Sequence, residues 1–193
     1  MRAVRSAQAR DDRFLVAGAR DGDAAMFTEL YHRHANHVFA RLTRLVGPVP
    51  EREDLLQHIF LDVHRALPQF RGDAAFTTFL YRIVVNVAYD HLDRQRRRPT
   101  EPLDEAALAT LLAPNSSPEQ RVQQRQELAL LFGLLGRLKP KKRIAFMLVV
   151  VEEMSYEEAA AIVAAEAAAV KQRVLAARRE LDALLARHAK GRG

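Results

Sequence analysis

The chain has 193 residues, 49% of them hydrophobic and none of them cysteine, with a formal net charge of +6 and a pI of about 10.0. This composition predicts a packed core and excludes disulfides and thiolate metal sites, which fits a reducing cytoplasm. We expect no signal peptide and no membrane insertion, because the first residues lack a continuous apolar core and no apolar run approaches about 20 residues. The positive charge favours a polyanionic partner, nucleic acid first and an acidic membrane second, over a protein that merely happens to be basic.

The first predicted block runs from about Asp11 to Arg98, and its apolar residues recur at helical spacing. The segment "GPVP" at residues 47–50 separates two predicted helices, because Gly and Pro end helices. The apolar stripe of the first helix consists of Phe27, Leu30, Tyr31, Val38, Leu42 and Leu45. The second helix turns one stripe inward, Leu55, Leu56, Ile59, Phe60, Val63 and Leu67, and leaves on its outer face Asp54, Gln57, His58, Leu61 and Arg65.

A loop and a third predicted helix, residues 70–98, combine aromatic side chains with many arginines. Single-stranded nucleic acid binds such surfaces, because rings stack on bases and cations pair with phosphates. A loop that contains glycine, such as "FRGDA", can also form the small polar pocket that holds an unstacked base. The alternative is that the aromatic residues form a core and the arginines a solvated face. For Phe79, Ile83 and Val87, spaced four residues apart, the core is favoured.

These residues resemble a known family. The segments "ARDGDAAMFTELYHRH" and "EDLLQHIFLDVHRALPQFRGDAAFTTFLYRIVVNVAYDHLDRQRRR" are similar to the promoter-melting domain of extracytoplasmic-function sigma factors, the small specificity subunits of bacterial RNA polymerase. Residues 138–181 resemble, less specifically, the C-terminal helix-turn-helix domain of that family. The resemblance extends from about Arg13 to Leu185. It implies a cytoplasmic protein that binds core RNA polymerase and promoter DNA, with an anti-sigma factor as a further candidate partner.

The resemblance also implies roles for single residues. The outer face of the second helix would dock on the largest polymerase subunit through Asp54, Gln57, His58 and Leu61. The loop that follows would capture a flipped base of the non-template strand, and the third helix would read the minus-ten element. The DNA-binding residues implied here are Phe70, Arg71, Gly72, Asp73, Arg82, Asn86, Asp90, Arg94, Arg97 and Arg98. Two positions depart from the family: Phe79 replaces the usual Trp, and Asp93, in place of Arg, puts an acid beside the DNA path.

The composition changes at Pro99, where a stretch with four prolines begins, and we expect a linker over residues 99–118 with one weak helical turn. In the second block, residues 155–181 form an alanine-rich stretch without Gly, Pro or Asn. Helix propensity favours one continuous helix here, whereas burial of the apolar residues 146–151 favours a bend. The resemblance implies the bent form, with a helix at 155–163, a turn at 164–166 and a recognition helix from Ala167. Ser155 and Glu158 have the spacing of a capping box.

In the bent form, the recognition helix would present to DNA Lys171, Gln172, Arg173, Arg178 and Arg179. A solvated helix face is the alternative. Ala164 stands where the family usually has Gly, which predicts a strain on the order of 1 kcal/mol if the residue takes a positive φ. Ala169 replaces a usual Thr and removes a hydroxyl that could contact phosphate. The basic residues 139–143 are a further candidate for phosphate contact.

The predicted fold is therefore all-α, with two small helical domains joined by a flexible linker, the second a helix-turn-helix. The domains are residues 11–98, similar to sigma region 2, and residues 119–187, similar to sigma region 4. We expect no catalysis and no cofactor, because the chain has no phosphate-binding loop and no nucleophile motif. His32, His34 and His37 raise the alternative of a metal site, but a surface cluster is favoured. The alternative function is a degenerate sigma-like protein that binds polymerase or a regulator without reading promoters.

Overall fold

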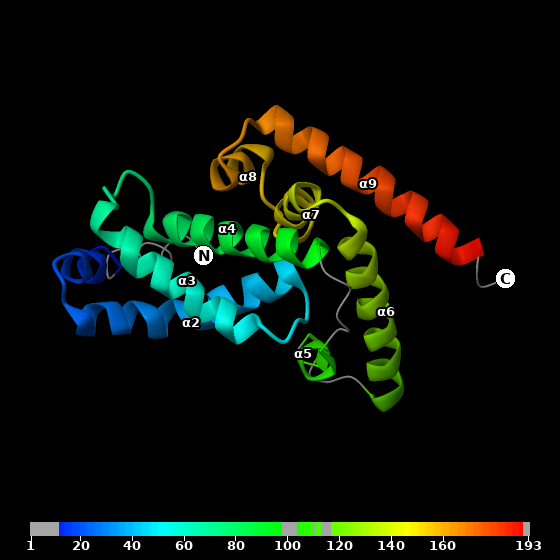
Figure 1. Ribbon diagram of the computed structural model, residues 1–193, viewed down its shortest axis with the longest axis horizontal. Helices are drawn as coiled ribbons and strands as arrows, with labels where there is room; N and C mark the ends of the chain where they lie inside the picture. The colour runs from blue at the N-terminus through cyan, green and yellow to red at the C-terminus, as the bar shows by residue number, and fades with distance from the viewer. Residues whose placement is uncertain (1–11, 98–103, 110, 113–116, 191–193) are drawn as a thin grey trace. The chain divides into compact units, whose positions relative to one another are not determined.

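The computed structural model describes residues 12–97, 104–109, 111–112 and 117–190 (Figure 1). The described residues are helical and contain no strand, which confirms the predicted fold class. No helix among them is both long enough and apolar enough to cross a membrane. Contacts divide the chain into two compact units, residues 1–42 with 51–87 and residues 43–50 with 88–193, as far as these are described. The domain boundaries at residues 98 and 119 stay predictions.

The first unit is built from an N-terminal helix, which includes residues 12–20, and from α2 (Ala24–Val46), α3 (Arg52–Ala66), η1 (Leu67–Gln69) and α4 (Phe76–Arg96). The turn between the N-terminal helix and α2 contains Gly22, whose φ of 93° is a conformation that glycine adopts without strain. The Oδ1 atom of Asp23 then accepts hydrogen bonds from the amides of Ala25 and Met26, which caps the start of α2. Both α2 and α4 extend from the first unit into residues of the second. As predicted, α2 ends before Gly47, whose φ is 88°.

The core of the first unit follows the predicted apolar stripes on α2 and α3. Its buried side chains include Leu30, Val38, Leu42, Leu55, Ile59, Val63, Leu67, Leu80 and Val84. On α4 the prediction was only partly right, because Phe79 and Ile83 are half-buried while Leu80 and Val84 are buried. Edge-on aromatic contacts join α2 to α3, with ring centroids 4.7 Å apart for Tyr31 and Phe60 and 4.9 Å apart for Phe27 and His64. We predicted that Phe27, Tyr31 and Leu56 face the core, and this was only partly right, because their side chains are half-buried. This packing fixes which face of α3 points to solvent.

The second unit contains α5 (Glu105–Ala109), α6 (Pro118–Arg137), α7 (Pro140–Phe146), η2 (Met147–Val151), α8 (Tyr156–Val163) and α9 (Ala167–Lys190). Helix α5 is the weak helical turn predicted within the linker. Helix α9 packs against α6, α7 and α8. The only β-branched run of the block forms η2, a wide helical turn in which the Glu152 amide donates to the Met147 carbonyl at 3.0 Å. Neighbouring helices therefore decide the structure of this run against its strand propensity.

The alanine-rich stretch bends at Ala164, which confirms the bent form. Ala164 adopts a left-handed conformation with φ 48° and ψ 53°, and the Ala165 amide donates to the Ala160 carbonyl at 3.1 Å, as in a helix C-terminal motif. Ser155 and Glu158 form the predicted capping box at the start of α8. Ile162 and Val170 are buried on either side of the bend. Burial of these side chains therefore outweighs the helix propensity of alanine.

We predict that Ala164→Gly stabilises the protein. A left-handed residue with a Cβ costs about 1–2 kcal/mol, whereas the greater freedom of Gly in the unfolded chain costs about 0.4–1 kcal/mol. Ala164 is exposed, so no cavity is created. The net gain of about 0.5–1 kcal/mol should raise the Tm by roughly 1–4 °C. Calorimetry measures this change. Ala183→Gly, at an exposed position inside α9, is the control and should lower the Tm instead.

Candidate functional site

The outer face of α3 is exposed, as the apolar pattern predicts. Asp54, Gln57 and His58 are exposed, and the side chain of Leu61 is 55% exposed. No hydrogen bond or ion pair joins Asp54 or Gln57 to another residue in the part of the chain that the structure describes. Asp54 lies in the first turn of α3, where the helix dipole favours a negative charge. A large apolar side chain among free polar groups suits contact with a protein partner.

The other polar groups of this face form ion pairs along the helix. Asp62 Oδ2 lies 3.3 Å from His58 Nε2, and Asp62 Oδ1 lies 3.4 Å from Arg65 Nη1. Both pairs are on the surface, where such pairs contribute little to stability. His58 therefore presents to solvent a ring that Asp62 orients.

The loop that begins at Phe70 divides into an anchored residue and an exposed tip. The Phe70 ring is half-buried, with its centroid 4.7 Å from that of Phe79 in α4. Arg71, Gly72 and Asp73 are exposed. Gly72 has a φ of 81°, and the space that a Cβ atom would occupy there is open. Arg71 and Asp73 are thus available to a ligand, whereas packing holds most of the Phe70 ring.

The outer face of α4 carries four of the predicted DNA-binding residues in one stripe, at a spacing of four residues. Arg82, Asn86, Asp90 and Arg94 are all exposed. Arg94 Nε also donates to the Asp90 carbonyl at 3.2 Å, which leaves the guanidinium near the helix end. This stripe combines cations with amide and carboxylate groups, the mixture that contacts both phosphates and base edges.

Asp93 and Arg97 form an ion pair at the end of α4. The acid that departs from the family pattern therefore neutralises one of the predicted DNA-binding arginines. Arg98, predicted to act beside it, lies outside the described residues. Two further exposed arginines, Arg94 and Arg96, lie at this end of α4.

The recognition helix α9 exposes four of the five side chains that we predicted to face DNA. Lys171, Gln172, Arg178 and Arg179 are exposed, and Arg173 is half-buried. The opposite face of α9 is buried through Val170, Val174, Ala177 and Leu181. Burial of that face fixes which residues α9 turns outward, because side chains three and four apart share a face.

Two predictions outside these faces need correction. Arg143, a candidate for phosphate contact, is only 4% exposed, and loss of hydration lowers its pKa to about 10. It is still charged at neutral pH but cannot reach a phosphate while buried. His34, expected in a surface cluster, is 6% exposed and lies 3.1 Å from Asp12. His32 and His37 are exposed.

Metal coordination finds no support among the described residues, which contain no cluster of three potential metal ligands.

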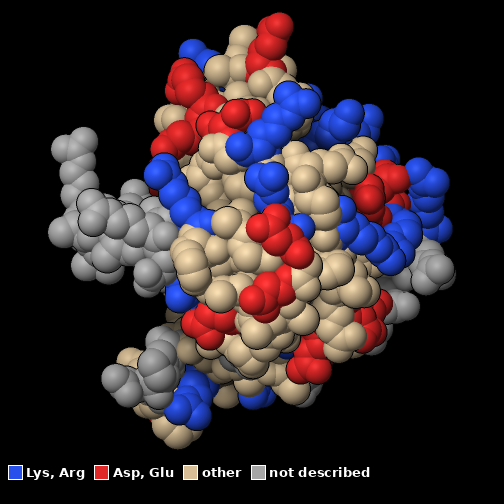
Figure 2. Space-filling view, turned by 90° about the vertical axis from the view of Figure 1, so that its left-hand side faces the viewer, with Lys and Arg blue, Asp and Glu red and all other residues tan. Residues whose placement is uncertain are grey.

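Acidic and basic side chains are interspersed on the face drawn in Figure 2, so the net positive charge does not form one continuous patch there. A polyanion that approaches this face would therefore meet local sets of cations.

The sequence matches two protein-family models, Sigma-70 region 2 over residues 30–98 and Sigma-70, region 4 over residues 128–181. The RNA polymerase sigma-H factor of Pseudomonas aeruginosa is 31% identical over 180 residues, which cover 90% of this chain and 93% of that protein. The ECF RNA polymerase sigma-E factor of Escherichia coli K12 is 35% identical over 179 residues, which cover 89% of this chain and 92% of that protein.

Solved structures agree with these relatives. CnrH, determined in complex with the cytosolic domain of CnrY, is 29% identical, with a TM-score of 0.60, covering 91% of this chain and 97% of that one. The sigma factor RpoE of Bartonella quintana, determined with the anti-sigma factor NepR, has a TM-score of 0.61 at 22% identity over 82% of this chain and 96% of that one, a likeness of fold alone.

Proposed function

Because the chain belongs to the extracytoplasmic-function family of RNA polymerase sigma factors, we propose that it binds core RNA polymerase and directs the recognition and melting of promoters. The observation that carries this proposal is the presence of both family regions in one chain, each with an exposed polar face on a packed helix. A sigma factor performs no bond chemistry of its own. It positions the polymerase and stabilises melted DNA through binding energy, at the chromosome in the cytoplasm.

We assign the polymerase contact to the outer face of α3. Asp54 and Gln57 offer free polar groups there, and Leu61 offers an apolar side chain that a partner can bury. Such a combination suits an interface with an apolar centre and a polar rim. An anti-sigma factor would be a second partner of the chain; the related CnrH was determined in complex with another protein, the cytosolic domain of CnrY.

We assign the melted DNA to the loop tip and to α4. Arg71 and Asp73 lie at the exposed tip, where an unpaired base can approach them. The stripe from Arg82 to Arg94 follows on α4 and suits the minus-ten element, because its cations can contact phosphates while Asn86 contacts a base edge.

We assign the upstream promoter element to α9. Lys171 and Gln172 lie near the start of this helix, the part that enters the major groove in helix-turn-helix proteins. The alternative, a sigma-like protein that no longer reads promoters, draws support from the small side chain of Ala169 and from the pairing of Asp93 with Arg97. The two functions differ in whether α9 selects DNA sequence.

Transcription from a promoter library with core polymerase tests this choice. We expect the full-length protein to select a two-part motif. Lys171→Ala combined with Arg178→Ala should then lower transcription from the best promoter by about tenfold or more, because each lost phosphate or base contact costs on the order of 1 kcal/mol or more. Arg187→Ala with Lys190→Ala, exposed near the end of α9, is the control and should have little effect. Polymerase binding without any sequence selection would favour the degenerate alternative.

A further inference from the structure

A hydrogen bond joins the N-terminal helix to the loop that begins at Phe70. Arg20, the last described residue of that helix, donates from Nη1 to the Phe70 carbonyl oxygen at 3.3 Å. The two residues are 50 positions apart in the chain and belong to the same compact unit. No local sequence pattern indicates this contact, and sequence reasoning did not find it.

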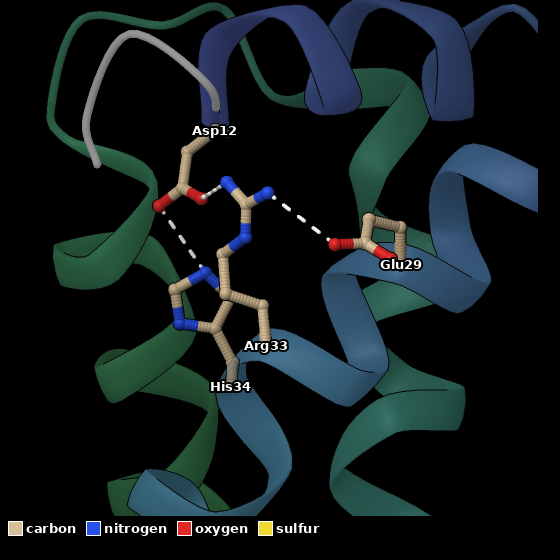
Figure 3. Close-up of polar contacts among 4 residues, drawn as sticks. All are labelled: Asp12, Glu29, Arg33 and His34. Atoms are coloured by element: carbon tan, nitrogen blue, oxygen red, sulfur yellow. Dashed lines mark hydrogen bonds and ion pairs between the residues drawn. The ribbon is translucent and has the colours of Figure 1, made fainter. Parts of the chain in front are cut away.

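The other end of the N-terminal helix is fixed to α2. Asp12 is 4% exposed, and its Oδ1 atom accepts from Arg33 Nη1 at 3.2 Å (Figure 3). Its Oδ2 atom lies 3.1 Å from His34 Nε2, and Arg33 also contacts Glu29. The buried side chains of Leu15 and Val16 hold the middle of the helix against the unit. Arg20 therefore extends from a helix that is held along its whole described length.

Phe70 is held from several directions, whereas residues 71–74 make no hydrogen bond with another described residue. Its amide donates to the Leu67 carbonyl at 3.0 Å, and its ring packs against Phe79 and, at 6.3 Å between centroids, Phe76. The hydrogen bond from Arg20 holds the Phe70 carbonyl group as well. Residues 71–75 are exposed, so the direction in which the loop tip leaves the unit is set at Phe70.

We propose that Arg20 is a positioning residue for base capture, and that the N-terminal helix braces the loop through it. This inference rests on the proposed function, which assigns base capture to the tip of the loop. A tip that is held before DNA melts loses less conformational freedom when the base arrives, so more of the contact energy is available for binding. Arg20 acts through the Phe70 carbonyl and need not touch the base.

Three full-length variants test the brace. Arg20→Ala removes the donor, Arg20→Lys keeps the charge and one donor group, and Arg13→Ala removes an exposed arginine of the same helix that has no polar contact with a described residue. In the free protein, Arg20→Ala should raise amide hydrogen exchange at Phe70, whose amide donates to the Leu67 carbonyl, about threefold or more, because the neighbouring hydrogen bond to the Phe70 carbonyl is lost. The Tm should stay unchanged, exchange elsewhere should be unaffected, and Arg20→Lys should restore part of the protection.

Base preference supplies the functional measurement. Each base of the melted non-template strand is varied in turn, and the preference of the protein for one base over the others is measured at each position. The captured position is the one at which the double variant Arg71→Ala, Asp73→Ala loses this preference. Arg20→Ala should reduce the preference at that position by about threefold to tenfold, while Arg13→Ala leaves it intact. A phosphate contact by Arg20 would instead weaken binding at all positions and lower the salt slope by about one unit, which would overturn the brace.

The outcomes separate the two proposals. Unchanged exchange at the Phe70 amide in Arg20→Ala would overturn the brace while leaving the proposed function intact. A lower Tm with exchange raised throughout the unit would also overturn it, because Arg20 would then be a general stabilising residue. If the wild-type protein supported no promoter-specific transcription, the proposed function would fail, and base capture with it.

Discussion

Asp54→Lys combined with Leu61→Arg is expected to abolish binding to core RNA polymerase while the fold survives. Reversing a charge at an interface turns attraction into repulsion worth several kcal/mol, and an arginine in place of the 55% exposed Leu61 would bring an unpaired charge into the contact. Affinity should therefore fall by more than about hundredfold. Neither side chain supports the core of the first unit, so the Tm should change by no more than a few degrees.

Co-purification and fluorescence anisotropy with core polymerase measure the loss. The matched control changes the same residue types on α9, Asp182→Lys with Leu185→Arg, both of which are exposed. The control should bind polymerase much as the wild type does. If the α3 double variant bound as tightly as the control, α3 would not be the docking face.

Arg71→Ala combined with Asp73→Ala is expected to slow open-complex formation by about tenfold or more, with little effect on closed-complex binding. The reason is that a base reaches the loop tip only after the duplex has opened, so the tip contributes to the melted state alone. Both side chains are exposed and Gly72 is kept, so the turn itself should be preserved. The arginines of α4 provide the contrast: Arg94→Ala should weaken both steps and lower the salt slope by about one unit.

Permanganate reactivity of unpaired thymines measures opening, and band shifts on duplex promoter DNA measure the closed complex. Asp182→Ala with Arg187→Ala, which also removes one acid and one base from exposed positions, is the control. Equal losses in opening and in closed-complex binding would show that the loop tip contacts duplex DNA and would refute base capture.

The pattern of apolar residues by itself determined the helical class and the outer face of α3. A stripe such as Leu55, Ile59 and Val63 fixes the inner side of a helix, so the opposite side is known before any partner helix is placed. The capping box at Ser155 was equally local, because Glu158 is only three residues away. Such features depend on spacings within one or two helical turns, which the sequence displays directly.

The tertiary structure decided the features that depend on contacts between distant residues. Helix propensity favours a straight helix through Ala164, and the bend exists because Ile162 and Val170 are buried on either side of it. The burial of Arg143 and of His34 likewise came from neighbours far along the chain, so their charged and polar character alone predicted exposure wrongly. The bond from Arg20 to Phe70 spans 50 residues and is created only by the packing of the N-terminal helix. Local energies of about 1 kcal/mol per residue rank the conformations of a segment, but burial of whole side chains, worth about 1.5–3 kcal/mol each, selects among them.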